Sequence, residues 1–133
     1  MSAPVHLFVY GTLMSGYDHP MARWLAERAD SQGEAVCQAR LYRVKHYPGL
    51  VLSADPADRV FGELFRLREV ESVLAKLDEY EGCGPGAAEP TQYIRTVQAV
   101  VLPDQSTVEA WIYLFNHPLA GLSRIVSGRF LAL

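Results

Sequence analysis

The sequence predicts an α+β fold, a small mixed β-barrel or curled sheet of about five to seven strands flanked by two main helices. Two observations predict this class. β-Prone segments outnumber helical ones, and the predicted elements follow the order β-α-β-β-α-β-β instead of a regular strand–helix alternation. The chain has 133 residues, with no internal repeat and no plausible linker, so a single domain over residues 1–133 is expected.

The first strand and the first helix are predicted close to the N-terminus. Residues 5–10 are β-branched and aromatic and stop at Gly11, which is typical of a buried strand running into a turn. After Pro20, apolar residues recur on one helical face, so a helix is expected over about residues 19–29, with Gly33 marking its end. The apolar residues of that face are Met21, Trp24 and Leu25.

The middle of the chain predicts β-structure followed by the clearest helix. Residues 35–44 and 59–66 are rich in β-prone side chains, and the second segment alternates apolar and non-apolar positions. Gly62 within it predicts a bulge or the close approach of another backbone or of a ligand. Residues 69–81 are expected to be helical and to end at Gly82. The apolar residues at helical spacing are Val70, Val73, Leu74 and Leu77.

The last third of the chain predicts a loop, a hairpin and a packed tail. Residues 82–92 are rich in Gly and Pro and should form the loop. Residues 93–102 and 107–115 are strand candidates joined by a short polar turn, as in a hairpin. The tail carries apolar side chains that should pack against the domain: Ile125, Phe130 and Leu131.

Charge, cysteine and histidine content exclude several function classes. The formal net charge is −3, from 12 Lys and Arg against 15 Asp and Glu, so neither nucleic acid nor an anionic membrane is an expected partner. Cys37 and Cys83 form no CxxC motif, which argues against a cysteine metal site and favours the cytoplasm. The four histidines are scattered, and no HExxH or GxSxG motif occurs. The apolar run over residues 5–10 is too short for a signal or a membrane span.

The predicted second helix carries an acidic residue on its apolar face. Glu81 follows Leu77 by four residues and Leu74 by seven, so it continues the stripe that faces the core. Burial, the negative end of the helix dipole and the like charges of Asp78 and Glu79 all favour a raised pKa for Glu81. These effects predict a base poised closer to neutral pH. The alternative is a solvent-exposed carboxylate beyond a frayed last turn.

The turn after the first strand is a second candidate site. A strand that ends in Gly11 lets the chain turn sharply and directs backbone N–H groups outward, where they can hold a carboxylate or a developing oxyanion. Thr12 and Ser15 add hydroxyl groups. The segment has neither the Lys-Ser/Thr of a phosphate-binding loop nor the spacing of a dinucleotide fingerprint. An ordinary strand-to-helix connection is the alternative.

Four short segments in a fixed order resemble a known family. They are Tyr-Gly-Thr-Leu at 10–13, Val-Phe-Gly-Glu-Leu at 60–64, Leu-Asp-Glu-Tyr-Glu-Gly at 77–82, and Tyr-Ile-Arg at 93–95, followed by Val97. In this order and spacing, the chain resembles the γ-glutamylcyclotransferase-like superfamily, particularly its small AIG2-like and γ-glutamylamine-cyclotransferase-like members, over about residues 6–115. The resemblance implies a small β-barrel flanked by helices, with a cavity between residues 10–13 and the acidic residue.

The resemblance also implies a reaction. Known members cyclise a γ-glutamyl group into 5-oxoproline and release the attached amine or amino acid, with no metal and no organic cofactor. The substrate's own α-amino group is the nucleophile, so the enzyme must fold the substrate and move protons. The matching positions are Glu81 as the catalytic acid and base, Tyr10, Gly11, Thr12 and Leu13 as substrate-binding residues, and Tyr93 as a pocket residue. Residues 83–90 depart from the family pattern and leave the choice of substrate open.

Two other function classes stay open from the sequence. A non-catalytic protein that binds a small ligand in the same cavity has the same features, because a carboxylate that binds an ammonium group looks like one that deprotonates it. A subunit of a larger assembly would expose an apolar patch. For the enzyme and the binding protein alike, the expected partner is a small γ-glutamyl-type or amino-acid-like ligand.

Overall fold

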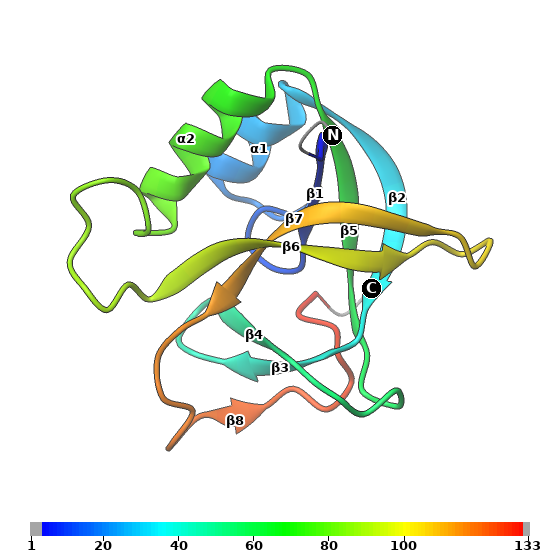
Figure 1. The fold of residues 1–133 in the computed structure, drawn as a ribbon, viewed down its shortest axis with the longest axis vertical. Helices are drawn as coiled ribbons and strands as arrows, with labels where there is room; N and C mark the ends of the chain where they lie inside the picture. The colour runs from blue at the N-terminus through cyan, green and yellow to red at the C-terminus, as the bar shows by residue number, and fades with distance from the viewer. Residues whose placement is uncertain (1–3, 132–133) are drawn as a thin grey trace.

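The computed structural model describes residues 4–131, which contain two helices and eight strands (Figure 1). The predicted domain also includes residues 1–3 and 132–133, which lie outside the described residues. In chain order the elements are β1 (His6–Val9), α1 (Pro20–Ala26), β2 (Ala29–Cys37), β3 (Ala39–Arg43), β4 (Pro48–Leu52), β5 (Val60–Leu67), α2 (Val70–Tyr80), β6 (Tyr93–Val101), β7 (Thr107–Phe115) and β8 (Ser123–Arg124).

Five strands form a strongly curled mixed sheet in the order β1-β5-β2-β6-β7. β1 pairs antiparallel with β5 and parallel with β7, so the pairings run round in a ring. β2 and β6 meet through the single pair Val36 and Val101, so the ring has a weak seam. The α+β prediction is confirmed in its curled-sheet form, rather than as a continuously hydrogen-bonded barrel.

A second, three-stranded sheet has the order β4-β3-β8. In Figure 1 this sheet lies at one end of the molecule and the two helices lie together at the other. The eight strands of residues 4–131 exceed the predicted number because the segment predicted over 35–44 divides between β2 and β3, while β4 and β8 are additional. Ile125 and Phe130 of the tail pack against a buried cluster, as expected.

The two faces of β1 contribute to two different hydrophobic clusters. Leu7 and Val9 belong to the cluster that the helices cover, whereas Phe8 and Tyr10 belong to the cluster on the other face. This is the period-two alternation of a strand that is buried on both sides. A Cβ atom on Gly62 of β5 would collide with the carbonyl oxygen of Val9, so the predicted close approach of another backbone is confirmed.

The two helices differ in how well their predicted limits hold. α2 has the predicted extent, with Glu69 and Glu81 as its capping residues. α1 ends at Ala26, earlier than predicted, because the chain enters β2 at once and pairs with β5. Gly33 does not end this helix; it lies within β2, where the pairing register with β5 shifts. No helix within residues 4–131 is long and apolar enough to cross a membrane.

Candidate active site

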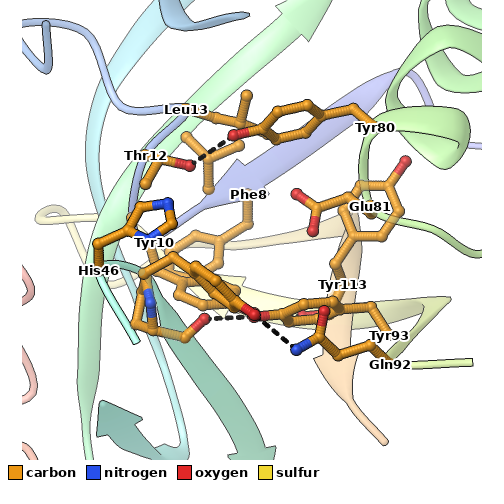
Figure 2. A pocket seen from close by; sticks show the side chains of 14 residues that line it. Phe8, Tyr10, Thr12, Leu13, His46, Tyr80, Glu81, Gln92, Tyr93 and Tyr113 are labelled. Atoms are coloured by element: carbon orange, nitrogen blue, oxygen red, sulfur yellow. Dashed lines mark hydrogen bonds between the residues drawn. The ribbon is translucent and has the colours of Figure 1, made fainter. Parts of the chain in front are cut away.

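A cavity of about 250 Å³ lies where β1 ends, beside the C-terminus of α2. It draws its walls from β1 and the loop after it, the turn between β3 and β4, the end of α2, and the start of β6 (Figure 2). The six residues that the family resemblance assigns to the site all line this cavity: Tyr10, Gly11, Thr12, Leu13, Glu81 and Tyr93.

The end of α2 is capped in a way that positions Glu81. Glu81 is the C-cap residue of this helix. The N–H of Gly82 donates to the carbonyl oxygen of Glu79 at 3.2 Å. The N–H of Cys83 donates to the carbonyl oxygen of Asp78 at 2.9 Å, which completes a Schellman motif. Gly82 has a φ of 72°, a conformation that glycine adopts without strain, so the helix ends sharply and Glu81 points into the cavity (Figure 2).

The Glu81 side chain is half-buried in the cavity wall and accepts no hydrogen bond within residues 4–131. Burial, and secondly the negative charge of Asp78, raise the pKa of Glu81 from 4.5 to about 7. Glu79 is exposed and, contrary to the sequence-based expectation, is not a cause of the shift. At neutral pH this carboxyl group can therefore both take up and release a proton.

The loop after β1 lines the cavity and has three main-chain N–H groups without an acceptor in residues 4–131. They are the N–H groups of Gly11, Thr12 and Leu13. The N–H of Met14 donates to the carbonyl oxygen of Gly11 at 3.0 Å and closes a tight turn. Glycine is required at position 11 for contact rather than for backbone freedom, because a Cβ there would lie 2.6 Å from Pro48 Cγ.

Glu63 on β5 holds this loop in place. Its carboxylate accepts hydrogen bonds from the Ser15 N–H at 2.8 Å and from the Ser15 hydroxyl at 2.5 Å. A third bond comes from the hydroxyl of Ser31 at 2.6 Å, beside the register shift in β2. Glu63 is 8% exposed, so three donors surround a buried acid. Sequence reasoning included Glu63 only as a letter of a family motif and missed this role.

Tyrosines form much of the remaining wall and hold its backbone together. The Tyr93 hydroxyl donates to the carbonyl oxygen of Pro48 at 2.6 Å, and the Tyr10 hydroxyl donates to that of Tyr113 at 2.6 Å. Thr12 Oγ1 and the Tyr80 hydroxyl lie 3.2 Å apart. Burial raises the pKa of both Tyr10 and Tyr93, so these hydroxyls stay protonated and act as fixed donors.

Several residues that line the cavity were not predicted from the sequence. They are Phe8, Val9, His46, Tyr47, Pro48, Tyr80, Gln92 and Tyr113. Tyr80 was within reach of sequence reasoning, because it directly precedes Glu81. No local sequence pattern indicated that His46 and Tyr47 line the cavity, because only the tertiary fold brings their turn to it. Gln92 Nε2 donates to the Tyr47 hydroxyl at 2.7 Å and links two walls (Figure 2).

Other chemical groups close to the cavity are few. Burial raises the pKa of Cys83 to about 11, so this thiol is protonated at neutral pH. No group of three or more His, Cys, Asp or Glu side chains in residues 4–131 is arranged to hold a metal ion.

The sequence matches a protein-family model. The model of the family described as "Gamma-glutamyl cyclotransferase, AIG2-like" matches residues 7–132. Among curated proteins, the "Gamma-glutamylcyclotransferase family protein" YtfP of Citrobacter rodentium is 30% identical over 128 residues, which cover 96% of each chain. YtfP of Escherichia coli K12 gives the same identity and coverage.

Solved structures give the same fold. The solution structure of YtfP from Escherichia coli has a TM-score of 0.63 and 29% identity, over 95% of this chain and 96% of that one. An AIG2-like protein from Mus musculus has a TM-score of 0.67 at 24% identity, over 88% and 82% of the two chains. YkqA from Bacillus subtilis has a TM-score of 0.71 at 22% identity and contains a matching region over 40% of its length. The last two likenesses concern the fold alone.

Proposed function

The chain belongs to the γ-glutamyl cyclotransferase, AIG2-like family, and on that premise we propose that it converts a γ-glutamyl amide into 5-oxoproline and a free amine. One observation carries the proposal. Glu81, with a pKa of about 7 and no hydrogen-bond partner within residues 4–131, lines the same cavity as residues 11–13, whose N–H groups also have no partner there.

The reaction requires proton transfer between two nitrogen atoms. The ionised Glu81 takes a proton from the substrate's α-ammonium group, and the freed amine attacks the γ-carbonyl carbon to close a five-membered ring. Glu81 then protonates the leaving nitrogen as its bond to that carbon breaks. The α-nitrogen loses two protons in becoming the lactam N–H, and the leaving nitrogen gains two in becoming an ammonium ion. Glu81 carries both protons in succession and ends ionised, as it began.

The loop after β1 supplies binding and charge stabilisation. We assign the free N–H groups of Gly11, Thr12 and Leu13 to the α-carboxylate of the substrate or to the oxyanion that develops on the γ-carbonyl. Tyr10 and Tyr93 are assigned to the wall that presses the substrate into a ring-closing shape, since fixed hydroxyl bonds hold both rings.

The charge of the cavity favours certain leaving groups. Among the described residues that line it, none is Lys or Arg. A leaving group that carries a carboxylate would therefore meet Glu81 without a Lys or Arg side chain in the cavity wall to offset the repulsion. We infer a preference for neutral or cationic leaving amines over amino acids.

The test is the release of 5-oxoproline from a panel of γ-glutamyl compounds with amine, amide and amino-acid leaving groups. We expect turnover by the wild-type protein and a loss of about two to four powers of ten in Glu81→Gln, the usual contribution of general acid–base catalysis. Glu79→Gln is the matched control, because it removes an exposed carboxylate from the same helix. Equal turnover in wild type and Glu81→Gln would refute the assigned role of Glu81.

A non-catalytic binding protein is the alternative that this experiment also addresses. Such a protein would be stabilised against heat by γ-glutamyl compounds and yet release no 5-oxoproline. For the enzyme, stabilisation and turnover should occur with the same members of the panel. Binding without turnover across the whole panel would support the binding protein.

A further inference from the structure

Asp78, one turn before Glu81 on α2, connects the helix end to the sheet. Its carboxylate accepts two hydrogen bonds from the guanidinium of Arg95, from Nε at 2.7 Å and from Nη2 at 3.0 Å. It also accepts one from the Tyr113 hydroxyl at 2.7 Å. The side chains of Asp78 and Arg95 are 14% and 25% exposed, so the ion pair is largely shielded from water. A shielded pair with paired N–H donors fixes both position and charge.

The sheet holds the cationic partner rigidly. Arg95 on β6 lies directly opposite Tyr113 in the pairing with β7, so one rung of the sheet supplies all three donors to Asp78. The Arg95 guanidinium also lies over the ring of Trp111, 4.5 Å from its centroid. The same β6 face carries Tyr93, two residues earlier, into the cavity. The network thus ties the end of α2 to the strands that form the cavity wall.

We propose that Asp78 and Arg95 are a positioning pair for Glu81: they hold the helix end against β6 and β7 and set the charge beside the reacting carboxylate. Glu81 is the third residue after Asp78, an i, i+3 spacing, so their side chains lie on neighbouring parts of the helix surface. The Asp78 charge disfavours ionisation of Glu81, and Arg95 limits that effect by neutralising Asp78. This proposal rests on the proposed function only in naming Glu81 as the reacting group.

Other titratable groups face Glu81 from each element packed around it. Asp78, Tyr80 and Cys83 belong to α2 and the residues after it, and Tyr10 belongs to the loop after β1. Tyr93 and Tyr113 belong to β6 and β7, and His46 belongs to the β3–β4 turn. Arg95 of β6 acts through Asp78. The pKa values of these tyrosines and of Cys83 are raised, so these groups stay neutral near pH 7. Asp78 and Arg95 form an ion pair beside Glu81, and each can be neutralised singly with an effect of opposite sign.

The experiment measures the pKa of Glu81 directly, by a carbon-13 NMR titration of the side-chain carboxyl, with Glu81→Gln assigning the signal. No substrate is needed. Asp78→Asn should lower the pKa of Glu81 by about 0.5 to 1, because it removes a negative charge. Arg95→Gln should raise it by about 0.5 to 1, because it leaves Asp78 without its cation. In the double variant, the pKa of Glu81 should lie between the values of the two single variants.

Two further variants separate charge from simple damage to the fold. Arg95→Lys keeps the positive charge and should leave the pKa of Glu81 close to that of the wild type. Its comparison with Arg95→Gln tests the effect of charge even if Asp78→Asn does not fold. The matched control is the remote pair of Arg40 and Asp58, whose members are 43% and 10% exposed at the side chain. Arg40→Gln and Asp58→Asn should leave the pKa of Glu81 unchanged.

Shifts of the same sign in Asp78→Asn and Arg95→Gln, or no shift in either, would overturn the proposal. So would an equal shift in the control pair, because it would show a general effect of net charge. The proposed reaction is judged separately, by 5-oxoproline release. Opposite shifts in a protein without turnover would keep the positioning pair and reject the reaction.

Discussion

Glu81 and Asp58 are two shielded acids at different sites, and the structure treats them in opposite ways. Asp58, in the loop before β5, accepts hydrogen bonds from Ser53, Arg40 and Arg124. These bonds hold the pKa of Asp58 well below its ordinary value, the bond from Ser53 and then that from Arg40 contributing most. Glu81 lines a cavity without any such donor in residues 4–131, and its pKa rises to about 7.

The difference teaches that burial alone does not decide how an acid behaves. Desolvation disfavours the charged form of both groups, but hydrogen bonds from donors outweigh it at Asp58. Glu63 is a third case, since its three donors satisfy it although it is buried. A cavity-lining acid whose carboxylate accepts no hydrogen bond from the described residues is the one that can bind a ligand. Four measurements test that contrast.

The largest expected effect concerns pH. If Glu81 must be ionised to begin the reaction, kcat/KM should fall about tenfold per pH unit below about 7 and be about a hundredfold lower at pH 5. Asp58→Asn should show the same profile, because Asp58 is already ionised throughout this range. The measurement is 5-oxoproline release from pH 5 to 8 at low substrate concentration. A flat profile would remove Glu81 from the role of base.

The next effect is on stability. Because the pKa of Glu81 is raised in the fold, its contribution is favourable below about pH 4.5 and is lost as pH rises through about 7. Glu81→Gln lacks this loss, so it should be more stable than wild type at pH 8, by at most about 3 kcal/mol, and equal to it at pH 4.5. Denaturant unfolding of both proteins at the two pH values checks this. A variant that is less stable at pH 8 would contradict the picture.

Asp58→Asn should act in the opposite direction. The lowered pKa of Asp58 stabilises the fold above its ordinary value of 3.8, and this contribution is lost as pH falls. The variant should therefore melt a few degrees below wild type at pH 7, and the gap should shrink at about pH 3. Thermal unfolding followed by circular dichroism measures both. A constant gap across this range would mean that ionisation of Asp58 does not stabilise the fold.

The smallest expected effect tests the satisfied acid beside the cavity. Ser15→Ala removes one of the donors to Glu63 and should loosen the loop over residues 11–13. If that loop binds the substrate, KM should rise by about threefold to tenfold while kcat changes little. Ser53→Ala, which removes a donor to Asp58, is the matched control and should leave KM unchanged. If both variants have the same KM as the wild type, the proposal that the loop over residues 11–13 binds the substrate is wrong.

Local patterns predicted the elements that depend on near neighbours. Helical spacing over residues 69–81 predicted α2 and placed Glu81 on its buried face, and Gly82 marked its end. The hairpin of β6 and β7 followed from its β-prone runs and turn residues. The predicted end of α1 and the predicted role of Gly33 as its end were wrong, because pairing of β2 with β5 overrides the local helical preference. The cytoplasmic location and the single domain over residues 1–133 stay predictions.

The sequence by itself determined which chemical groups the site could contain, because an acid at the end of an apolar helix face and a glycine-bounded turn are readable from spacing alone. Only the tertiary structure decided which donors reach which acid. Ser15 meets Glu63 and Arg95 meets Asp78 across strands far apart in the chain, whereas no donor of residues 4–131 reaches Glu81. Since donors lower a carboxyl pKa and desolvation raises it, that long-range pairing makes Glu81 the acid that can exchange a proton near neutral pH.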